Sequence, residues 1–356
     1  KIETIVLVLT SAAVFFIAYI LYFFSVTKPI IFPTYVVNKY AIEFENKIVK
    51  KRIKYLIYFW LFMSFIELIV ATNFPFLSLL GFGNYVNYVN FGIGGLHGLL
   101  NAIFLFLACY FVIKYKSTNE NKYLFILFLM FLWPILLMTR QLLLSFLIEI
   151  LFIHLITVRI SFFRGVKIFF AIMSAIIFFG LLGDLRSNRE FFIAASSPTF
   201  QYPEYLPSGF LWVYIYITTP LNNINNNINI IDPLYFPFHT AASMLPSFLR
   251  DGFTNLFDIQ KNSLELVTDT FNVSSFFDPF LLDFGLYAIH IPLFILAIIS
   301  LFVMHRAQNN IVYVFILAIM LHSIVMTIFA NFITHIVFII QMVLAFFIFN
   351  MRRIKF

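Results

Sequence analysis

Long apolar runs alternate with short polar connections along most of this chain of 356 residues. A helix needs about 20 apolar residues, within a range of roughly 17 to 25, to cross the hydrocarbon core of a bilayer. The first run, Ile5 to Phe24, lacks a small-x-small cleavage site, so we interpret it as a spanning helix and not as a signal peptide. In all, the pattern predicts nine spanning helices, at 5–25, 53–72, 95–113, 123–139, 141–158, 167–183, 285–304, 311–329 and 333–350.

The segment of about residues 184–284 breaks this pattern. Two of its stretches, 210-FLWVYIYI-217 and 234-LYFPFHTAASMLPSFL-249, are aromatic and apolar but too short to span. We expect them to form interfacial or re-entrant helices. As short spans they would raise the total from nine to eleven. Between them, the asparagine-rich run 221-LNNINNNINI-230 predicts a polar turn.

The glycine-rich stretch 81-GFGNYVNYVNFGIGG-95, within the connection 73–94, also stands out. Its glycines indicate a tight backbone that could re-enter the membrane. It does not match the phosphate-binding loop, because no Gly-Lys-Ser or Gly-Lys-Thr follows and no strand precedes it.

The composition agrees with a membrane protein: 62% of residues are hydrophobic, 11% are charged and the mean hydropathy is +0.97. A soluble domain is about half apolar and about a quarter charged. We therefore expect an all-α, polytopic transmembrane helix bundle of 9–11 spans, forming one domain over 1–356. The only cysteine, Cys109, lies in an apolar run, where we expect a small buried side chain. No Cys or His spacing predicts a metal site.

The basic residues set the orientation. Most of the 23 Lys and Arg fall in 26–54, 114–122, 159–167, Arg306 and the tail, which the alternation of spans places on one side. The positive-inside rule makes that side cytoplasmic. The long segment 184–284 then lies on the outer face, with more than half of the 16 acidic residues. The net charge of +7 thus reflects topology and does not indicate nucleic acid.

Ionisable residues inside spans are functional candidates, because each costs about 2.5–3.5 kcal/mol to insert. Arg140, between two runs that are barely long enough to span, must lie at the outer boundary in a tight turn; it either snorkels or binds an anion. Glu67 and Glu149 either pair with a buried donor or serve catalysis or a proton path. We expect hydrogen bonds across helices from the histidines in or near spans, namely His97, His154, His290, His322 and His335.

The stretch 183-GDLRSNRE-190 gathers charge at the mouth of the long segment. If one helix continued past Gly183, Arg186, Arg189 and Glu190 would share a face. Two guanidiniums there could bind a diphosphate bidentately, and the alternative is a solvated Arg186–Glu190 ion pair. Further along, His239 either acts as a general base or is structural.

Four features in this order resemble the Wzy-type O-antigen (oligosaccharide repeat-unit) polymerases of bacterial inner membranes. They are an arginine that begins a helix in 140-RQLLLSFLIEIL-151, a span that ends in 183-GDLR-186, the aromatic 214-YIYITTPLNN-223, and an acidic-Phe-Gly turn before a helix in 278-DPFLLDFGLYAIHIPLFILAI-298. The resemblance covers about residues 130–300. Members of the family usually have ten to fourteen spans, and the R-x10-G spacing of some members is not found here.

The resemblance implies a periplasmic, metal-independent glycosyltransferase of the inner membrane, with no cofactor. Its donor would be a growing glycan on undecaprenyl diphosphate, and its acceptor a lipid-linked repeat unit. A chain-length regulator and a flippase would be its partners, besides membrane lipids. The expected residues are, for the diphosphate, Arg140, Arg186, Arg189 and Arg250; for catalysis, His239, with Asp184 and Glu190; and for sugar or loop-helix contacts, Tyr214, Tyr216, Asp278 and Asp283, the two last also being reserve bases.

Two other functions stay open. An O-antigen ligase would use the same donor but pass the glycan to lipid A-core. A flippase or transporter of lipid-linked oligosaccharide would favour internal repeats and broken helices that meet at the midplane. The sequence shows no repeat, and its outer arginines gather at one face.

Overall fold

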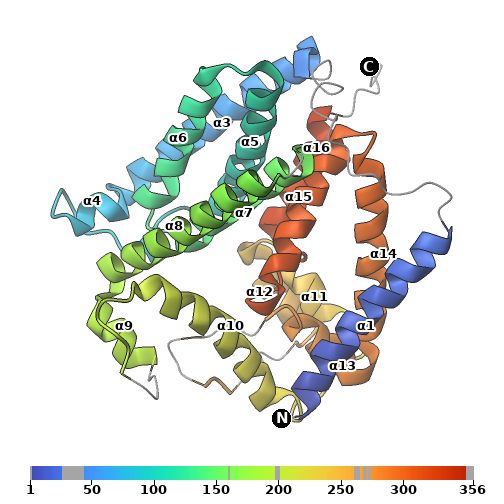
Figure 1. Ribbon diagram of the computed structural model, residues 1–356. Helices are drawn as coiled ribbons and strands as arrows, with labels where there is room; N and C mark the ends of the chain where they lie inside the picture. The colour runs from blue at the N-terminus through green and yellow to red at the C-terminus, as the bar shows by residue number, and fades with distance from the viewer. Residues whose placement is uncertain are drawn as a thin grey trace.

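Helices and their connections make up the part of the chain that the computed structural model describes (Figure 1). That part comprises residues 2–25, 44–158, 161–196, 201–259, 265–267, 271, 273 and 275–349, without the side chains of Val89, Arg186 and Ser187. Within it, β-structure is limited to an isolated bridge between Ser275 and Ala330. The helices are α1 (Ile2–Ser25), α3 (Lys47–Ala71), α4 (Pro75–Leu79), η1 (Tyr88–Asn90), α5 (Leu96–Thr118), α6 (Asn121–Leu136), α7 (Arg140–Thr157), α8 (Phe162–Ser187), α9 (Arg189–Ser196), α10 (Ser208–Asn227), α11 (Phe238–Ser243), α12 (Ser247–Leu256), α13 (Asp278–Ala288), α14 (His290–Ala307), α15 (Ile311–Val325), η2 (Met326–Ile328) and α16 (Ile336–Phe349).

All nine predicted spans coincide with helices. Among the described residues, seven helical stretches are long and apolar enough to cross a membrane: α1, α3 with α4, α5, α7, α8, α14, and α15 with η2. The other two, α6 and α16, are apolar but have only 16 and 14 residues. The chain is therefore an all-helical protein with multi-pass character. Large apolar side chains such as Phe62, Phe65 and Phe170 are exposed on the outside of the bundle, as expected of a lipid-facing surface.

Helix α5 forms the centre of the bundle. Every residue from Ala102 to Ile113 is buried. It packs against α3, α6, α7 and α16, and α15 joins the same core through α7 and α16. Because this part of α5 is apolar on all sides, the central position buries every face of the helix against other helices.

The long segment folds onto one end of the bundle. Helix α8 ends at Ser187, because Asn188 has a left-handed φ of 59°, and α9 starts a new direction at Arg189. The continuous helix that would have placed Arg186, Arg189 and Glu190 on one face is therefore not formed. Figure 1 shows α9, α10 and α13 near the end where α1 begins. Two small cores hold this region together, one among α8, α9 and α10 and one among α1, α10, α13 and α14.

The asparagine-rich run is helical from Leu221 to Asn227, so the predicted turn is limited to 228–230. It forms the last turns of α10, with Asn223 and Asn227 fully buried. The Asn223 amide donates to the carbonyls of Phe271 (3.0 Å) and Val273 (2.9 Å), and its oxygen accepts from the backbone N–H of Val267 (2.9 Å). These asparagines therefore hold the backbone groups of Glu265, Val267, Phe271 and Val273 against α10.

The expected polar pairs inside the bundle are formed by Glu149, by His154 and by Glu67, which contacts His97. The Glu149 carboxylate accepts from the amide of Gln341 and from the thiol of Cys109, which is buried as predicted. His154 on α7 contacts Lys116 on α5, with 2.8 Å between His154 Nδ1 and Lys116 Nζ. His322 differs from the expectation: its ring centroid lies 4.8 Å from that of Phe338, and neither of its ring nitrogens has a hydrogen-bond partner among the described residues.

Candidate functional site

A polar cavity of about 510 Å³ lies where α5, α7 and α10 meet the segments that precede α5 and α16. Its apolar wall includes Phe91, Leu142, Phe329 and Phe338. Its polar lining consists of Tyr88, His97, Asn101, Thr139, Arg140, Gln141, Ser145, Tyr216 and His335. This mixture of donors, acceptors and rings is typical of a site for a polar ligand with a carbon skeleton, such as a sugar.

Arg140 is the first residue of α7 and only 6% exposed. Its guanidinium carbon lies 3.8 Å from the centroid of the Trp212 ring on α10 and 5.3 Å from that of Phe179 on α8. The tight turn that the sequence predicts before α7 is formed, with Met138 at a positive φ of 55°. The cation is therefore held between three helices at the edge of the cavity.

Gly183 makes this arrangement possible. A Cβ atom at position 183 would lie 2.7 Å from a terminal nitrogen of Arg140 and 2.6 Å from Nε1 of Trp212. Both approaches are shorter than real Cβ contacts allow. The glycine that opens 183-GDLR-186 thus provides the space in which the guanidinium and the indole meet.

Glu67 and His97 form a pair, and His97 lines the polar cavity. The Glu67 carboxylate is almost fully buried, and its Oε2 lies 3.0 Å from His97 Nδ1. Its Oε1 accepts from the backbone N–H of Ile93 at 3.0 Å. The ring of His97 lines the cavity beside Phe91, whose centroid is 5.9 Å away. Gly92, with a φ of 99°, is required here because a Cβ would approach the His97 ring to 2.6 Å.

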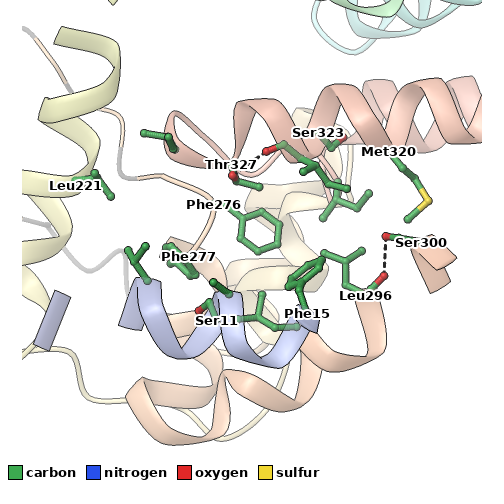
Figure 2. A pocket seen from close by; sticks show the side chains of 16 residues that line it. Ser11, Phe15, Leu221, Phe276, Phe277, Leu296, Ser300, Met320, Ser323 and Thr327 are labelled. Carbon is green, nitrogen blue, oxygen red and sulfur yellow. Dashed lines mark hydrogen bonds between the residues drawn. The ribbon is translucent and has the colours of Figure 1, made fainter. Parts of the chain in front are cut away.

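Two further cavities are apolar. One, of about 250 Å³, lies between α7, α8 and α10 and shares Tyr216 with the polar cavity. Another, of about 400 Å³, is lined by α1, α10, α14 and α15, with the rings of Phe15, Phe276 and Phe277 (Figure 2). Its hydroxyl groups bond to the backbone of their own helices, as Ser300 does to the Leu296 carbonyl (2.8 Å). Both suit hydrocarbon and offer nothing to a charged ligand.

Of the sequence-predicted residues, Arg140 and Tyr216 line the polar cavity. Arg250 lies close enough to His335, another lining residue, for its charge to act on that imidazole. Its guanidinium donates to the carbonyls of Ala242 (3.1 Å) and Leu245 (3.2 Å) at the end of α11. Arg250 thus fastens α11 to α12 at the rim of the site.

Two predicted charged residues are engaged in holding loops. One terminal nitrogen of Arg189 donates to the carbonyls of Glu204 (2.8 Å) and Leu206 (3.0 Å), so Arg189 fixes the connection before α10. Asp184 accepts from the Ser208 hydroxyl at 2.7 Å, at the beginning of α10. Neither residue lines the polar cavity.

His239 lies on α11, away from the lining of the cavity. The buried Asp283 accepts from the backbone N–H groups of His239 and Thr240, both at 2.8 Å, and so caps this helix. Burial lowers the pKa of His239, and the nearby Asp283 opposes that shift. Asp278 begins α13, where burial raises its pKa to about 7.

Two other predicted residues do not line the polar cavity either. Glu190 and Tyr214 are exposed. Arg186 belongs to the last turn of α8, and its side chain lies outside the described residues.

Sequence reasoning named Glu67 and His97 but did not join them. It left Glu67 open between a buried pair and a role in catalysis or a proton path, and it expected a hydrogen bond across helices from His97. One signal was present: a carboxylate within an apolar helix requires a partner, and a histidine follows the glycine-rich stretch. Among the described residues, no three His, Cys, Asp or Glu side chains gather in a way that could hold a metal ion.

Comparison of this chain with protein-family models, with curated proteins and with solved structures found no match.

Proposed function

We propose that this chain is a membrane glycosyltransferase that joins oligosaccharide repeat units carried on undecaprenyl diphosphate, at the outer face of a bacterial inner membrane. The observation that carries the proposal is the place of Arg140, a buried cation at the rim of a polar cavity. The cavity has the size and the mixed lining that a sugar diphosphate requires. The product would be an O-antigen or a related surface polysaccharide.

An anion at the rim would be stabilised by two sources of positive potential. The N-terminus of α7 has the positive end of a helix dipole, with no acidic residue in its first turn and no side-chain cap. A buried arginine at that position adds a positive charge where the dipole already disfavours one. The negative charge of a diphosphate leaving group compensates both the helix dipole and the Arg140 cation. The diphosphate can also accept two parallel hydrogen bonds from a guanidinium.

The surroundings of Arg140 also fit the rest of such a donor. The apolar cavity between α7, α8 and α10 contains Phe179, one of the two rings that contact Arg140, and it shares Tyr216 with the polar cavity. A diphosphate at Arg140 would thus have its sugars in the polar cavity and its isoprenoid chain beside the apolar one. Aromatic side chains such as Tyr216 and Phe91 offer flat surfaces to sugar rings.

The test is to delete the gene in its host, restore it with variants, and separate the surface polysaccharide on a gel. We expect the deletion to leave a single repeat unit on lipid A-core and the wild-type gene to restore the ladder. Arg140→Ala should lower polymer formation by about 10²–10³-fold, as loss of a residue that stabilises developing negative charge does. Arg140→Lys should restore only part of the polymer formation, because an ammonium group cannot bind a phosphate bidentately.

Arg306→Gln is the matched control, because that arginine also packs on a ring, Phe302 at 5.2 Å, but lies at the end of α14 and outside the polar cavity. Equal expression of all variants is verified by immunoblot. Loss of all glycan from lipid A-core, with polymer still on the carrier lipid, would identify a ligase instead. Repeat units that accumulate on the cytoplasmic leaflet would identify a flippase.

A further inference from the structure

We infer that His97, oriented by Glu67, is the general base that takes the proton from the acceptor hydroxyl. This inference rests on the proposed glycosyl transfer and assigns a catalytic role to a pair that the sequence analysis did not join. It departs from the sequence-based choice of His239, whose side chain is not part of the cavity lining.

The geometry defines which nitrogen reacts. As a carboxylate, Glu67 can only accept, so the 3.0 Å contact assigns the proton of the neutral imidazole to Nδ1. Nε2 then carries the lone pair, and within the described part of the chain it makes no hydrogen bond. Because Glu67 is also fixed by the backbone N–H of Ile93, the ring cannot turn without breaking a buried hydrogen bond. An imidazole held by a carboxylate in this way has the arrangement of a general base.

His97 and Arg140 line the same cavity, so one substrate complex can contact both. In the reaction the acceptor oxygen forms a bond to the anomeric carbon of the donor. The bond from that carbon to the diphosphate oxygen breaks, and its electron pair leaves with undecaprenyl diphosphate beside Arg140. The hydroxyl proton moves to Nε2 of His97, so charge and atoms balance without a further reactant.

Purified full-length protein, reconstituted with a lipid-linked repeat unit, separates catalysis from binding. We expect His97→Gln to lower the single-turnover rate of transfer by about 10²–10⁴-fold while the affinity for undecaprenyl diphosphate stays within twofold. Arg140→Lys should instead weaken that affinity. His305→Gln, at the end of α14 and outside the cavity, is the matched control and should transfer at the wild-type rate.

Glu67→Gln tests the positioning role with almost no change of shape. Its oxygen can still accept from Ile93, but its amide would donate to Nδ1 of His97 and move the proton to Nε2, where it blocks the base. We expect the single-turnover rate of Glu67→Gln to fall nearly as much as that of His97→Gln, whereas Glu67→Asp should recover part of the rate. A merely structural Glu67 would give equal rates in the glutamine variant and the wild type.

Transfer at the wild-type rate by His97→Gln, or loss of transfer in His239→Gln alone, would overturn the assignment and leave the proposed function intact. Failure of the wild-type protein to polymerise would refute the proposed function itself.

Discussion

The guanidinium of Arg140 lies 3.8 Å from the centre of the Trp212 indole, and the contact occurs directly over Gly183. Three helices meet at this point, since Arg140 begins α7, Trp212 belongs to α10 and Gly183 lies in the last two turns of α8. A cation against the face of a tryptophan gains about 0.5–2 kcal/mol, more when water is excluded. The position of the proposed diphosphate ligand therefore depends on a residue that has no side chain.

Gly183→Ala should displace Arg140 or Trp212, because the new methyl group would lie within 2.7 Å of both. We expect weaker binding of undecaprenyl diphosphate and loss of polymer formation, with the helical content unchanged. Gly165→Ala is the matched control on the same helix, because a Cβ there meets nothing within 4 Å. Wild-type donor affinity in Gly183→Ala would contradict the need for this space.

The crossing of α8 and α10 should tolerate an added methyl group even less than position 183 does. A Cβ on Gly209 would lie 2.0 Å from the Ile176 carbonyl, and one on Gly180 would lie 2.2 Å from the Gly209 nitrogen. Gly209→Ala should therefore force the two helices apart, and overpacking of this kind costs about 1–3 kcal/mol. The measurement is the thermal melting temperature in detergent, which should fall for Gly209→Ala. In Gly165→Ala it should stay equal or rise, since alanine is the better helix former.

The helices could be predicted from the sequence, because apolar length alone fixes where a chain crosses about 30 Å of hydrocarbon. The functional site could be predicted only in part. Arg140 stands out because a cation beside an apolar run is costly wherever the fold places it. The pairing of Glu67 with His97 depends on how α3 packs against α5, which no local pattern encodes. Asn223 misled the interpretation because asparagine is usual in turns, whereas here tertiary hydrogen bonds compensate its weak helix propensity.

Asn223→Ala should destabilise the outer segment. The substitution leaves the carbonyls of Phe271 and Val273 and the N–H of Val267 without their partner, and each buried unsatisfied group costs about 1–3 kcal/mol. We expect faster proteolysis of the segment after α12 in the folded protein. Asn222→Ala, one residue earlier on an exposed position of α10, should leave the cleavage rate unchanged. Equal cleavage of the two variants would show that the buried amide does not fasten the segment.

Asp278 should make stability depend on pH in the direction opposite to that of an ordinary paired carboxylate. Burial raises the pKa of Asp278 to about 7, above its usual value of 3.8, so the folded state binds the proton more tightly than the unfolded state. The stabilisation is complete below about pH 4 and is lost as the pH rises to about 7, at up to about 1.4 kcal/mol per pH unit. Asp278→Asn should remove this contribution, because an amide stays neutral throughout.

The free energy of unfolding in urea, measured at pH 5 and pH 8, should therefore differ less in the Asp278→Asn variant than in the wild type. An equal difference in the two proteins would show that Asp278 is ionised in the folded state.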